Sequence, residues 1–382
     1  MTRRSRELEL QGIDVINLSI GQPDFDTPEF IKDAAKEGMD QGYTGYTPVA
    51  GYLELRKAIC HKLERDNGLV YTPDQIVVST GAKQSLVNAM LSLVNPGDEV
   101  IVPAPYWVSY KEMVKLAEGK AIVIQGSLEN DFKVTPDQVR AAITPRSRIF
   151  IFSSPCNPTG SVYTRDELYA LAMVLKDFPD VYIISDEIYE LINFSGKHES
   201  IAQFDFIRER VILINGLSKG FAMTGWRLGY MAADKEIAKA CDKIQGQITS
   251  GASSISQRAA IRAMEVDPAT STEVIAMREE FLQRRNLLLE LMETLPGLKT
   301  YTPEGAFYLF PNVTSYFGKS NGDCTISNAT DLCMYLLDKA HVALVPGDAF
   351  GCSSCLRFSY ATSRDKIRES VRRIREALAL LK

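Results

Sequence analysis

The stretch VILINGLSKGFAMTGWRLGYM (residues 211–231) joins two apolar runs through a loop that carries one lysine and one arginine. Short apolar, β-branched runs of the same kind recur upstream, between helical patterns, at residues 76–78, 100–102, 121–124, 149–152 and 181–184. Near-continuous apolar strands that alternate with helices indicate a parallel sheet with both faces buried. The sequence therefore predicts a doubly wound α/β fold with about seven strands in a mostly parallel sheet.

The sequence changes character after residue 275. We expect a long charged helix at 277–295, strands near 306–310, 343–345 and 356–360, and a last amphipathic helix that opens at 362–365 with capping-box spacing. A chain of 382 residues also exceeds the usual size of one hydrophobic core. These observations predict a large domain at residues 27–275 and a smaller α/β domain made of residues 1–26 and 276–382.

The composition argues against several classes of partner. The formal net charge is −5, whereas nucleic acid or an anionic membrane favours a basic face. No run approaches the roughly 18 apolar residues of a membrane span, and no apolar signal region follows the basic N-terminus. Seven cysteines, an odd number, are typical of reduced thiols, so we expect a cytoplasmic protein. Cys352 and Cys355 form a C-x-x-C without a second ligand pair, which favours two incidental thiols over a metal site.

Several common catalytic motifs are absent from the sequence. It contains no G-x-G-x-x-G, no G-x-x-x-x-G-K and no H-E-x-x-H. The standard dinucleotide fingerprint, the P-loop and the helical zinc-protease motif are therefore excluded. His61, His198 and His341 belong to no motif, and we interpret them as structural.

Lys219 lies in the loop between the two apolar runs, flanked by Ser218 and Gly220, and Arg227 follows eight positions later. A lysine that forms an imine needs a free amine near neutral pH, and therefore a lowered pKa. An imine cofactor that also carries a phosphate needs a positive partner such as Arg227. A solvated loop lysine is the alternative interpretation.

Two polar motifs also follow predicted strands, at the strand ends where open α/β sheets bind ligands. In SDEIY (185–189), the Asp186 carboxylate could keep a pyridine nitrogen protonated, and the Tyr189 phenol could reach an oxygen on the same ring. In SPCNPTG (154–160), the Asn157 amide is held between two prolines and could donate to that oxygen. A helix N-cap for Asp186 and an Asn-Pro turn for Asn157 are the alternatives.

Three more features suit a flat, anionic ligand. The turn at Gly81-Ala82-Lys83 enters a helix and presents backbone N–H groups to an anion such as a phosphate. Trp107 follows a strand and either stacks on a cofactor or packs in the core. Arg357 interrupts an apolar strand and needs a partner, which a substrate carboxylate would supply.

Taken together and in this order, the motifs resemble those of the class I aminotransferases, which are fold-type I enzymes dependent on pyridoxal 5'-phosphate. The resemblance runs from GQPDF (21–25) to SYATS (359–363), nearly the whole chain. It is strongest to bacterial aspartate aminotransferases of the subgroup that includes bifunctional aspartate/prephenate enzymes. The family usually has a further stretch before the helix that contains Arg6, Glu7 and Leu8, so we expect a substrate contact and a dimer arm to be missing here.

The resemblance implies that Lys219 binds pyridoxal 5'-phosphate as a Schiff base and then moves the substrate proton. The other implied cofactor contacts are Asp186 at the ring nitrogen, Tyr189 and Asn157 at the ring oxygen, Trp107 against the ring, and Gly81, Ala82 and Arg227 at the phosphate, with Lys83 and Ser218 beside them. A homodimer is also implied, in which Tyr46 of one subunit reaches the phosphate of its neighbour.

For the substrate, the resemblance implies that Arg357 binds the α-carboxylate and that the backbone at Gly21 closes over the amino acid. Trp107 and Asn157 are further implied contacts. Lys83 matches a lysine that grips the side-chain carboxylate of a dicarboxylic substrate, and a solvated lysine at a helix start is its alternative.

These roles imply ping-pong transamination between an L-amino acid, aspartate first and then glutamate or the arogenate–prephenate pair, and a 2-oxo acid such as 2-oxoglutarate. An aromatic aminotransferase is an alternative. Another is a β-lyase or an aminocyclopropane-carboxylate synthase-like enzyme on the same scaffold. The least favoured alternative is the cofactor-sensing domain of a transcription regulator, because the chain has neither room for a DNA-binding domain nor a basic charge.

Overall fold

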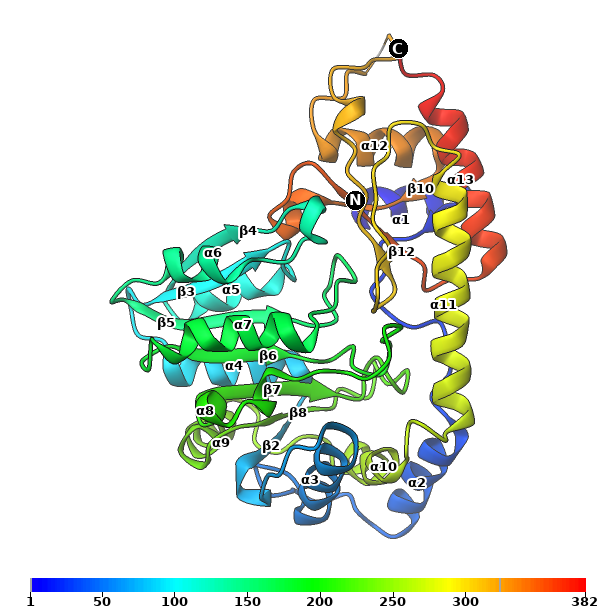
Figure 1. Cartoon of the computed structure of the whole chain (residues 1–382). Helices are drawn as coiled ribbons and strands as arrows, with labels where there is room; N and C mark the ends of the chain where they lie inside the picture. The colour runs from blue at the N-terminus through cyan, green and yellow to red at the C-terminus, as the bar shows by residue number, and fades with distance from the viewer. Residues whose placement is uncertain (1, 323) are drawn as a thin grey trace.

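The computed structural model describes residues 2–322 and 324–382; Met1 and Asp323, both assigned to the predicted small domain, lie outside the described residues. A seven-stranded sheet forms the centre of the larger part of the molecule (Figure 1). In spatial order its strands are β2 (Ile76–Ser79), β8 (Gly229–Ala232), β7 (Val211–Gly216), β6 (Tyr182–Asp186), β5 (Ser147–Ser153), β3 (Glu99–Ala104) and β4 (Lys120–Gln125).

The strand directions bring several loops to one edge of this sheet. β8 runs antiparallel to β2 and β7, and the other neighbouring strands are parallel. Each predicted apolar run forms one strand, so the mostly parallel α/β sheet is confirmed. Because β2, β3, β5, β6 and β7 all end at the same edge, the polar motifs that follow them meet there.

Alternate residues of the central strands are buried on opposite faces of the sheet. Phe150 and Phe152 of β5 belong to one apolar cluster, whereas Ile149 and Ile151 belong to another. The first cluster includes residues of α2 (Glu29–Asp40), α3 (Leu53–Asn67), α6 (Pro136–Ala142), α7 (Arg165–Lys176), α8 (Asp205–Arg208) and α10 (Ser254–Glu265). The second includes residues of α4 (Ala82–Leu93), α5 (Ser109–Leu116) and α9 (Lys235–Ile248).

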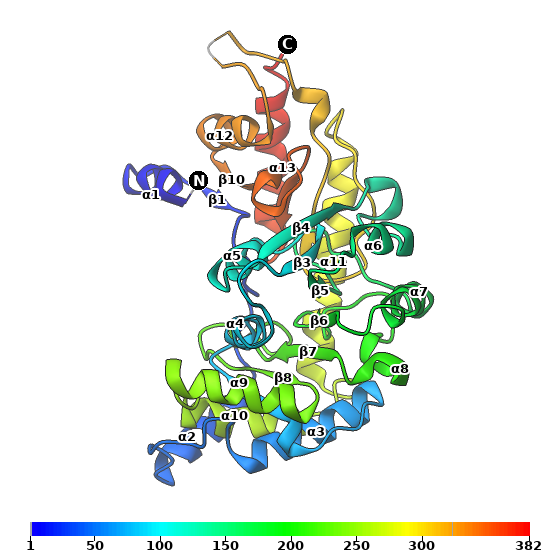
Figure 2. The ribbon, with the colours of Figure 1, turned by 90° about the vertical axis from the view of Figure 1, so that its left-hand side faces the viewer.

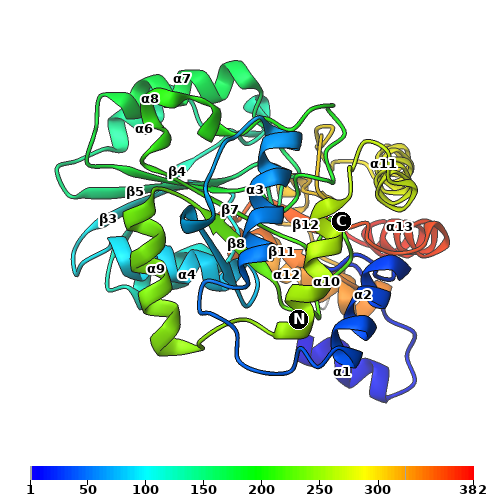
Figure 3. The same cartoon turned by 90° about the horizontal axis from the view of Figure 1, so that it is seen from below.

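Figures 2 and 3 show α6, α7 and α8 on one side of the sheet and α4 and α9 on the other. Burial on both faces explains why these strands are continuously apolar in the sequence. β4 is the exception, because it is an edge strand whose inner residues are only partly buried and whose end residues, Lys120 and Gln125, are exposed.

The smaller part of the molecule surrounds a separate apolar cluster, which includes Leu18, Phe281, Leu332 and Ile374. The long helix α11 (Thr272–Met292) runs along one side of the molecule toward it (Figure 1). Its other elements are α1 (Thr2–Leu10), α12 (Ala329–Ala340), α13 (Arg364–Leu378), the antiparallel sheet β11 (Val345–Pro346), β12 (Leu356–Ser359) and β9 (Tyr308–Leu309), and the parallel pair β1 (Ile16–Asn17) and β10 (Val342–Ala343). The domain boundaries at residues 27–275 remain a prediction.

Short 3₁₀ helices connect several of these elements. They are η1 (Pro73–Gln75), η2 (Leu128–Asn130), η3 (Ile201–Gln203), η4 (Thr314–Tyr316) and η5 (Gly347–Phe350). Within residues 2–322 and 324–382, no helix has the length and apolar character needed to cross a membrane.

Several predicted boundaries in the smaller part are wrong. The strand expected at 343–345 is two strands, β10 and β11, which belong to different sheets. Helix α11 begins at Thr272 rather than 277, because the Ser271 side chain accepts a hydrogen bond from the N–H of Val274 and caps it, and it ends at Met292 rather than 295. The capping box expected at 362–365 is absent, since the N-cap of α13 is Ser363, whose side chain accepts from the N–H of Lys366.

Candidate active site

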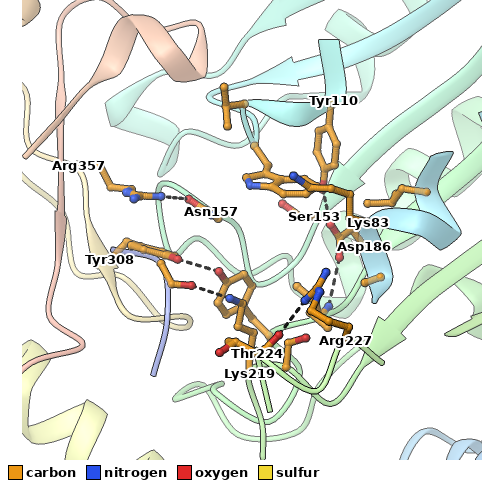
Figure 4. Close-up of a pocket in the computed structure, with 18 residues that line it drawn as sticks. Lys83, Tyr110, Ser153, Asn157, Asp186, Lys219, Thr224, Arg227, Tyr308 and Arg357 are labelled. Carbon is orange, nitrogen blue, oxygen red and sulfur yellow. Dashed lines mark hydrogen bonds between the residues drawn. The ribbon is translucent and has the colours of Figure 1, made fainter. Parts of the chain in front are cut away.

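A cavity of about 400 Å³ opens at the carboxyl edge of the large sheet (Figure 4). Asp186 ends β6 and Ser153 ends β5, while Lys219 lies in the turn after β7. Gly21 and Arg357 belong to the smaller part and line the opposite side of the cavity. Loops from both parts of the molecule therefore form one site.

The Lys219 amine is held inside this cavity by a 2.6 Å hydrogen bond to the carbonyl oxygen of Gly21. Burial, followed by the positive charges of Arg357 and Arg227, lowers the pKa of Lys219 to about 8, although Asp186 acts in the opposite direction. Part of the Lys219 population therefore has an unprotonated amine near neutral pH, which imine formation requires.

The Asp186 carboxylate is buried on the other side of the cavity, and two neutral groups of the described residues donate hydrogen bonds to it. Oδ2 accepts a 2.6 Å bond from the Tyr110 hydroxyl, and Oδ1 accepts a 3.3 Å bond from the N–H of Ile188. Burial raises the pKa of Asp186 to about 6. A cationic group bound beside this carboxylate would supply the opposite charge that burial makes favourable.

The turn that enters α4 forms a small anion site with Arg227. Gly81 is the N-cap at φ 83°, so the first turn of α4 directs unpaired N–H groups outward. A Cβ atom on Gly81 would lie 2.6 Å from Nη2 of Arg227, which shows how closely the guanidinium packs over the turn. Nη1 of Arg227 donates to the carbonyl of Thr224 at 2.8 Å, and Ser218 lies buried at the same end of the cavity.

The Arg357 guanidinium is buried and oriented by fixed partners. Nη1 donates to Oδ1 of Asn157 at 3.0 Å, and Nη2 donates to the carbonyl of Ser19 at 2.6 Å. The guanidinium also lies 4.5 Å from the ring centre of Tyr308 and 5.0 Å from that of Phe350. Its buried Nε has no hydrogen-bond partner among the described residues. This remaining donor marks a place for an acceptor from a ligand.

Two phenols meet between the sheet side and the Arg357 side of the cavity. The hydroxyl oxygens of Tyr189 and Tyr308 lie 2.8 Å apart, and both side chains are buried. A Cβ atom on Gly21 would lie 2.7 Å from the Tyr308 hydroxyl, so the N-terminal segment passes directly over this phenol. Gly21, Tyr189 and Tyr308 therefore form one contact group.

The indole of Trp107 lines the cavity beside a lysine. Nζ of Lys83 lies 4.9 Å from the indole centre, and the edge of the Tyr110 ring packs against the same indole at a centroid distance of 5.6 Å. Lys83 belongs to the first turn of α4, so its ammonium is on the opposite side of the cavity from Arg357 (Figure 4).

Most of the predicted site residues meet in this cavity. The lining includes Gly21, Ala82, Lys83, Trp107, Asn157, Asp186, Tyr189, Ser218, Lys219, Arg227 and Arg357. Gly81 lies immediately behind the lining, against Arg227. Tyr46 is not part of this lining, because its side chain is fully exposed on the surface of this chain.

The cavity also contains residues that no sequence motif predicted. Tyr110 and Tyr308 are the most important of these, and Ser153 and Thr224 also line it. Tyr110 lies three residues after Trp107, in the first turn of α5, and its N–H donates to the Trp107 carbonyl at 2.9 Å. Tyr308 lies in an apolar strand and has no signal in the sequence.

The charge of the lining favours an anionic ligand. Lys83, Lys219, Arg227 and Arg357 contribute positive charges, and Asp186 contributes a carboxylate. In the described part of the chain, no group of three or more His, Cys, Asp or Glu side chains could hold a metal ion. The cavity therefore combines a reactive amine with separate anion sites at Arg227, Arg357 and Lys83.

Comparisons with known proteins agree with this chemistry. A family model described as aminotransferase class I and II matches residues 13–374. A bifunctional aspartate aminotransferase and glutamate/aspartate-prephenate aminotransferase from Petunia hybrida is 48% identical over 384 residues, which cover 100% of this chain and 80% of that protein. An aspartate/prephenate aminotransferase from Cereibacter sphaeroides is 46% identical, over 98% of this chain and 94% of its own length.

Solved structures give the same result. The crystal structure of the aspartate aminotransferase from Rhizobium meliloti superimposes with a TM-score of 0.97 at 42% identity, covering 100% of this chain and 95% of that one. The aspartate aminotransferase from Thermus thermophilus with maleate superimposes with a TM-score of 0.92 at 40% identity, covering 98% and 95%.

Proposed function

This chain belongs to the aminotransferase class I and II family, and from that membership we propose that it transfers the amino group of L-aspartate to a 2-oxo acid such as 2-oxoglutarate. It is an aminotransferase in fold and in family. The proposal concerns its cofactor, which we take to be pyridoxal 5'-phosphate, and its substrates. The observation that carries it is the meeting of Lys219, Asp186 and Arg357 around one cavity.

Three features of the cavity fit this cofactor. The buried Asp186 carboxylate accepts hydrogen bonds from two neutral groups, Tyr110 and the N–H of Ile188, which suits a protonated ring nitrogen as its charge partner. The close packing of Gly81 against Arg227 forms a cradle for a phosphate. The lowered pKa of Lys219 suits an amine that bonds covalently to an aldehyde. Asn157, Tyr189 and Trp107 would complete the contacts with the ring.

Pyridoxal 5'-phosphate supplies, when bound, a carbonyl carbon for the amino group and a protonated ring that accepts electrons from the substrate. Arg357 would bind the α-carboxylate through its remaining Nε donor and orient the Cα–H bond. Lys219, once the substrate has displaced it, would take the proton from Cα with its free amine. Asp186 would stay ionised beside the ring nitrogen, since the positive charge there lowers its pKa.

The preference for a dicarboxylic substrate rests on Lys83. Its ammonium lies across the cavity from Arg357, so the two cations suit the two carboxylates of aspartate or glutamate. Prephenate also carries two carboxylates, and relatives named aspartate/prephenate aminotransferases make it a second candidate amino acceptor. The indole of Trp107 beside Lys83 offers an apolar face for its ring.

We also propose a homodimer in the cytoplasm. Tyr46 is fully exposed, and Ile20, Leu53 and Ile248 are exposed apolar side chains, which supports a covered surface between two subunits. In that arrangement Tyr46 would reach the Arg227 site of the neighbouring subunit. All seven cysteines are free thiols, which supports a reducing compartment.

A half-reaction on the purified protein tests the substrate proposal. L-aspartate, L-glutamate, L-tyrosine and arogenate are added separately while the visible absorbance of the lysine-bound cofactor is followed. We expect aspartate and glutamate to remove this band and 2-oxoglutarate to restore it. A response to tyrosine alone would contradict the role of Lys83 but leave the aminotransferase intact. The absence of a band after cofactor is added would contradict the role of Lys219.

The Lys219→Ala variant tests the catalytic assignment directly. We expect no measurable turnover, while the other contacts still bind the cofactor without a covalent bond. Lys115→Ala, at an exposed position on α5, is the matched control and should keep normal activity. Near-normal turnover in Lys219→Ala would refute the assignment.

A further inference from the structure

The C-x-x-C sequence at 352–355 occupies a turn between η5 and β12. The N–H of Cys355 donates to the carbonyl of Cys352 at 3.4 Å, which is the bond between the first and fourth residues of a β-turn. Such a turn brings the two Cα atoms within about 7 Å, and a disulfide bond needs roughly 4.4–6.8 Å. The backbone therefore already has a geometry in which the two sulfur atoms can be joined.

The two thiols are also directed toward the same point. The Ser354 hydroxyl lies 3.4 Å from Sγ of Cys352 and 3.6 Å from Sγ of Cys355. Their exposure differs, because Cys355 is buried at 1% exposure whereas Cys352 is only partly buried. One thiol is thus accessible to a reagent, and the other is protected behind it.

Cys352 opens into a second surface cavity, separate from the active site and about 320 Å³ in volume. Ser354 lines this cavity with Cys352, and Gln125 and Asn312 add polar groups. Lys299 adds a positive charge, and Glu129 adds a negative charge. The cavity is large enough for a small peptide-like molecule, and its lining can bind amide and carboxylate groups.

We propose that Cys352 and Cys355 form a thiol–disulfide exchange site, in which Cys352 reacts with low-molecular-weight disulfides and Cys355 resolves the product. This assignment replaces the interpretation of the pair as incidental thiols. It does not depend on the proposed aminotransferase substrates.

The electrostatics of the pair support an attacking role for Cys352. The neighbouring Cys355 thiol has the largest effect on the pKa of Cys352 and lowers it, whereas burial and the charge of Asp348 act in the opposite direction. The pKa of Cys355 is raised by the same interaction. Burial instead raises the pKa of four other thiols: Cys60, Cys156, Cys241 and Cys333. The thiolate is the nucleophile in exchange reactions, so Cys352 is favoured over these four.

The reaction is balanced by the incoming disulfide. The Cys352 thiolate attacks one sulfur of that disulfide, which forms a mixed disulfide and releases one thiolate. The Cys355 thiol then loses its proton and attacks Sγ of Cys352, which releases the second thiolate. The protein dithiol has lost two electrons and two protons, and the small disulfide has become two thiols.

The pair is directly connected to the active site. The carbonyl of Cys355 accepts from the N–H of Gly347 at 2.8 Å, and the N–H of Cys352 donates to the carbonyl of Gly347 at 2.9 Å. Phe350, in the same 3₁₀ helix, packs against Arg357, and its carbonyl accepts a 3.1 Å bond from Tyr106, next to Trp107. Oxidation of the pair would therefore act on the turn that supports Arg357.

Oxidised glutathione is the probe for the test, applied to the full-length protein and followed by peptide mass mapping. We expect the peptide that contains Cys352 and Cys355 to lose two hydrogens in the wild type. In Cys355→Ala we expect a glutathione adduct to accumulate on Cys352, and in Cys352→Ala we expect Cys355 to remain unmodified. Cys60→Ser is the matched control and should react like the wild type.

The pH dependence of alkylation gives a second readout on the wild type, which holds even if a variant fails to fold. Iodoacetamide should label Cys352 at a lower pH than Cys60, because the Cys355 thiol lowers the pKa of Cys352 and burial raises the pKa of Cys60. The proposal is overturned if Cys352 and Cys60 label with the same pH dependence. It is also overturned if oxidised glutathione leaves the pair reduced while it modifies other cysteines.

Discussion

The Tyr110 hydroxyl donates a 2.6 Å hydrogen bond to Oδ2 of Asp186, and both side chains are buried at the base of the active-site cavity. Burial is the main reason that the pKa of Asp186 is raised to about 6, and the bond from Tyr110 acts against it. A carboxylate in this position suits a cationic cofactor ring but is costly for the folded protein alone. Function and stability therefore place opposite demands on Asp186.

Asp186→Asn should stabilise the cofactor-free protein above pH 6. The folded-state pKa of this acid is raised from 3.8 to about 6, so the folded protein holds a proton that the unfolded chain releases. Stability consequently falls as the pH rises from about 4 to about 6, by roughly 3 kcal/mol, and then stays constant. Asp186→Asn does not lose stability in this pH range. Urea unfolding should therefore give a higher free energy of unfolding for the variant than for the wild type at pH 7.5, and this difference should disappear at pH 4.

Asp177→Asn, at an exposed position, is the control for Asp186→Asn, and its free energy of unfolding should show no comparable pH-dependent gain over the wild type. A stability difference between Asp186→Asn and the wild type that is equal at pH 4 and pH 7.5 would contradict the raised pKa. Asp186→Asn should also bind pyridoxal 5'-phosphate more weakly than the wild type, because it has lost the charge opposite the ring nitrogen.

Tyr308 has two separable contacts, which two substitutions can distinguish. Tyr308→Phe removes the hydroxyl that lies 2.8 Å from the Tyr189 hydroxyl and keeps the ring beside Arg357. Burial and, after it, Tyr308 raise the pKa of Tyr189. Tyr308→Phe removes the second of these effects, so it should shift the pH dependence of the cofactor absorbance and leave KM for aspartate nearly unchanged. Tyr308→Leu also removes the ring, so its KM should rise roughly 2–30-fold, for a lost cation–π contact of about 0.5–2 kcal/mol.

Steady-state kinetics and absorbance titrations of both Tyr308 variants provide the measurement. Equal KM values for Tyr308→Phe and Tyr308→Leu would show that the ring does not orient Arg357. If the absorbance of Tyr308→Phe changes with pH in the same way as that of the wild type, the hydroxyl pair has no effect on the cofactor.

Lys83→Met should change substrate preference rather than general activity. Methionine keeps most of the apolar stem beside Trp107 and removes the ammonium. The loss of a charged hydrogen bond, about 1.5–3 kcal/mol, predicts that kcat/KM for aspartate falls roughly 10–150-fold. The kcat/KM for tyrosine, which has no side-chain carboxylate, should stay within a few-fold of the wild type. An equal fall for both amino acids would contradict the assigned role.

Site residues could be predicted from the sequence where their signal was local. Lys219, Asp186 and Asn157 each follow an apolar strand in a short motif, and parallel strands carry such motifs to one edge. The contacts of Tyr110 with Asp186 and of Tyr308 with Tyr189 join residues 76 and 119 positions apart. No periodicity relates such distant positions, so only the fold could show them.

The wrongly predicted strand and helix boundaries in the smaller part of the molecule have a similar cause. Residues 342–346 form one apolar run in the sequence, but β10 pairs with β1 and β11 pairs with β12, so long-range pairing divides the run. Helix ends depend on which hydroxyl reaches a free N–H, and Ser363 rather than the adjacent Thr362 has the extended backbone of an N-cap with that bond.

Gly81→Ala should weaken cofactor binding while the fold survives. Both Gly81 and Gly97 have positive φ angles, 83° and 88°, so alanine at either position costs roughly 1–3 kcal/mol of backbone strain. Only at Gly81 would the new Cβ lie 2.6 Å from Nη2 of Arg227, whereas a Cβ at Gly97 would have no atom within 4 Å. The flexible guanidinium would move aside and lose its position above the first turn of α4.

We therefore expect Gly81→Ala to raise the dissociation constant for pyridoxal 5'-phosphate roughly 10–100-fold, from the loss of a charge-assisted bond, and Gly97→Ala to leave it unchanged. Fluorescence titration of the cofactor-free proteins gives both constants, and thermal unfolding should show similar losses of stability. Equal dissociation constants for the two variants would mean that Arg227 does not hold the phosphate.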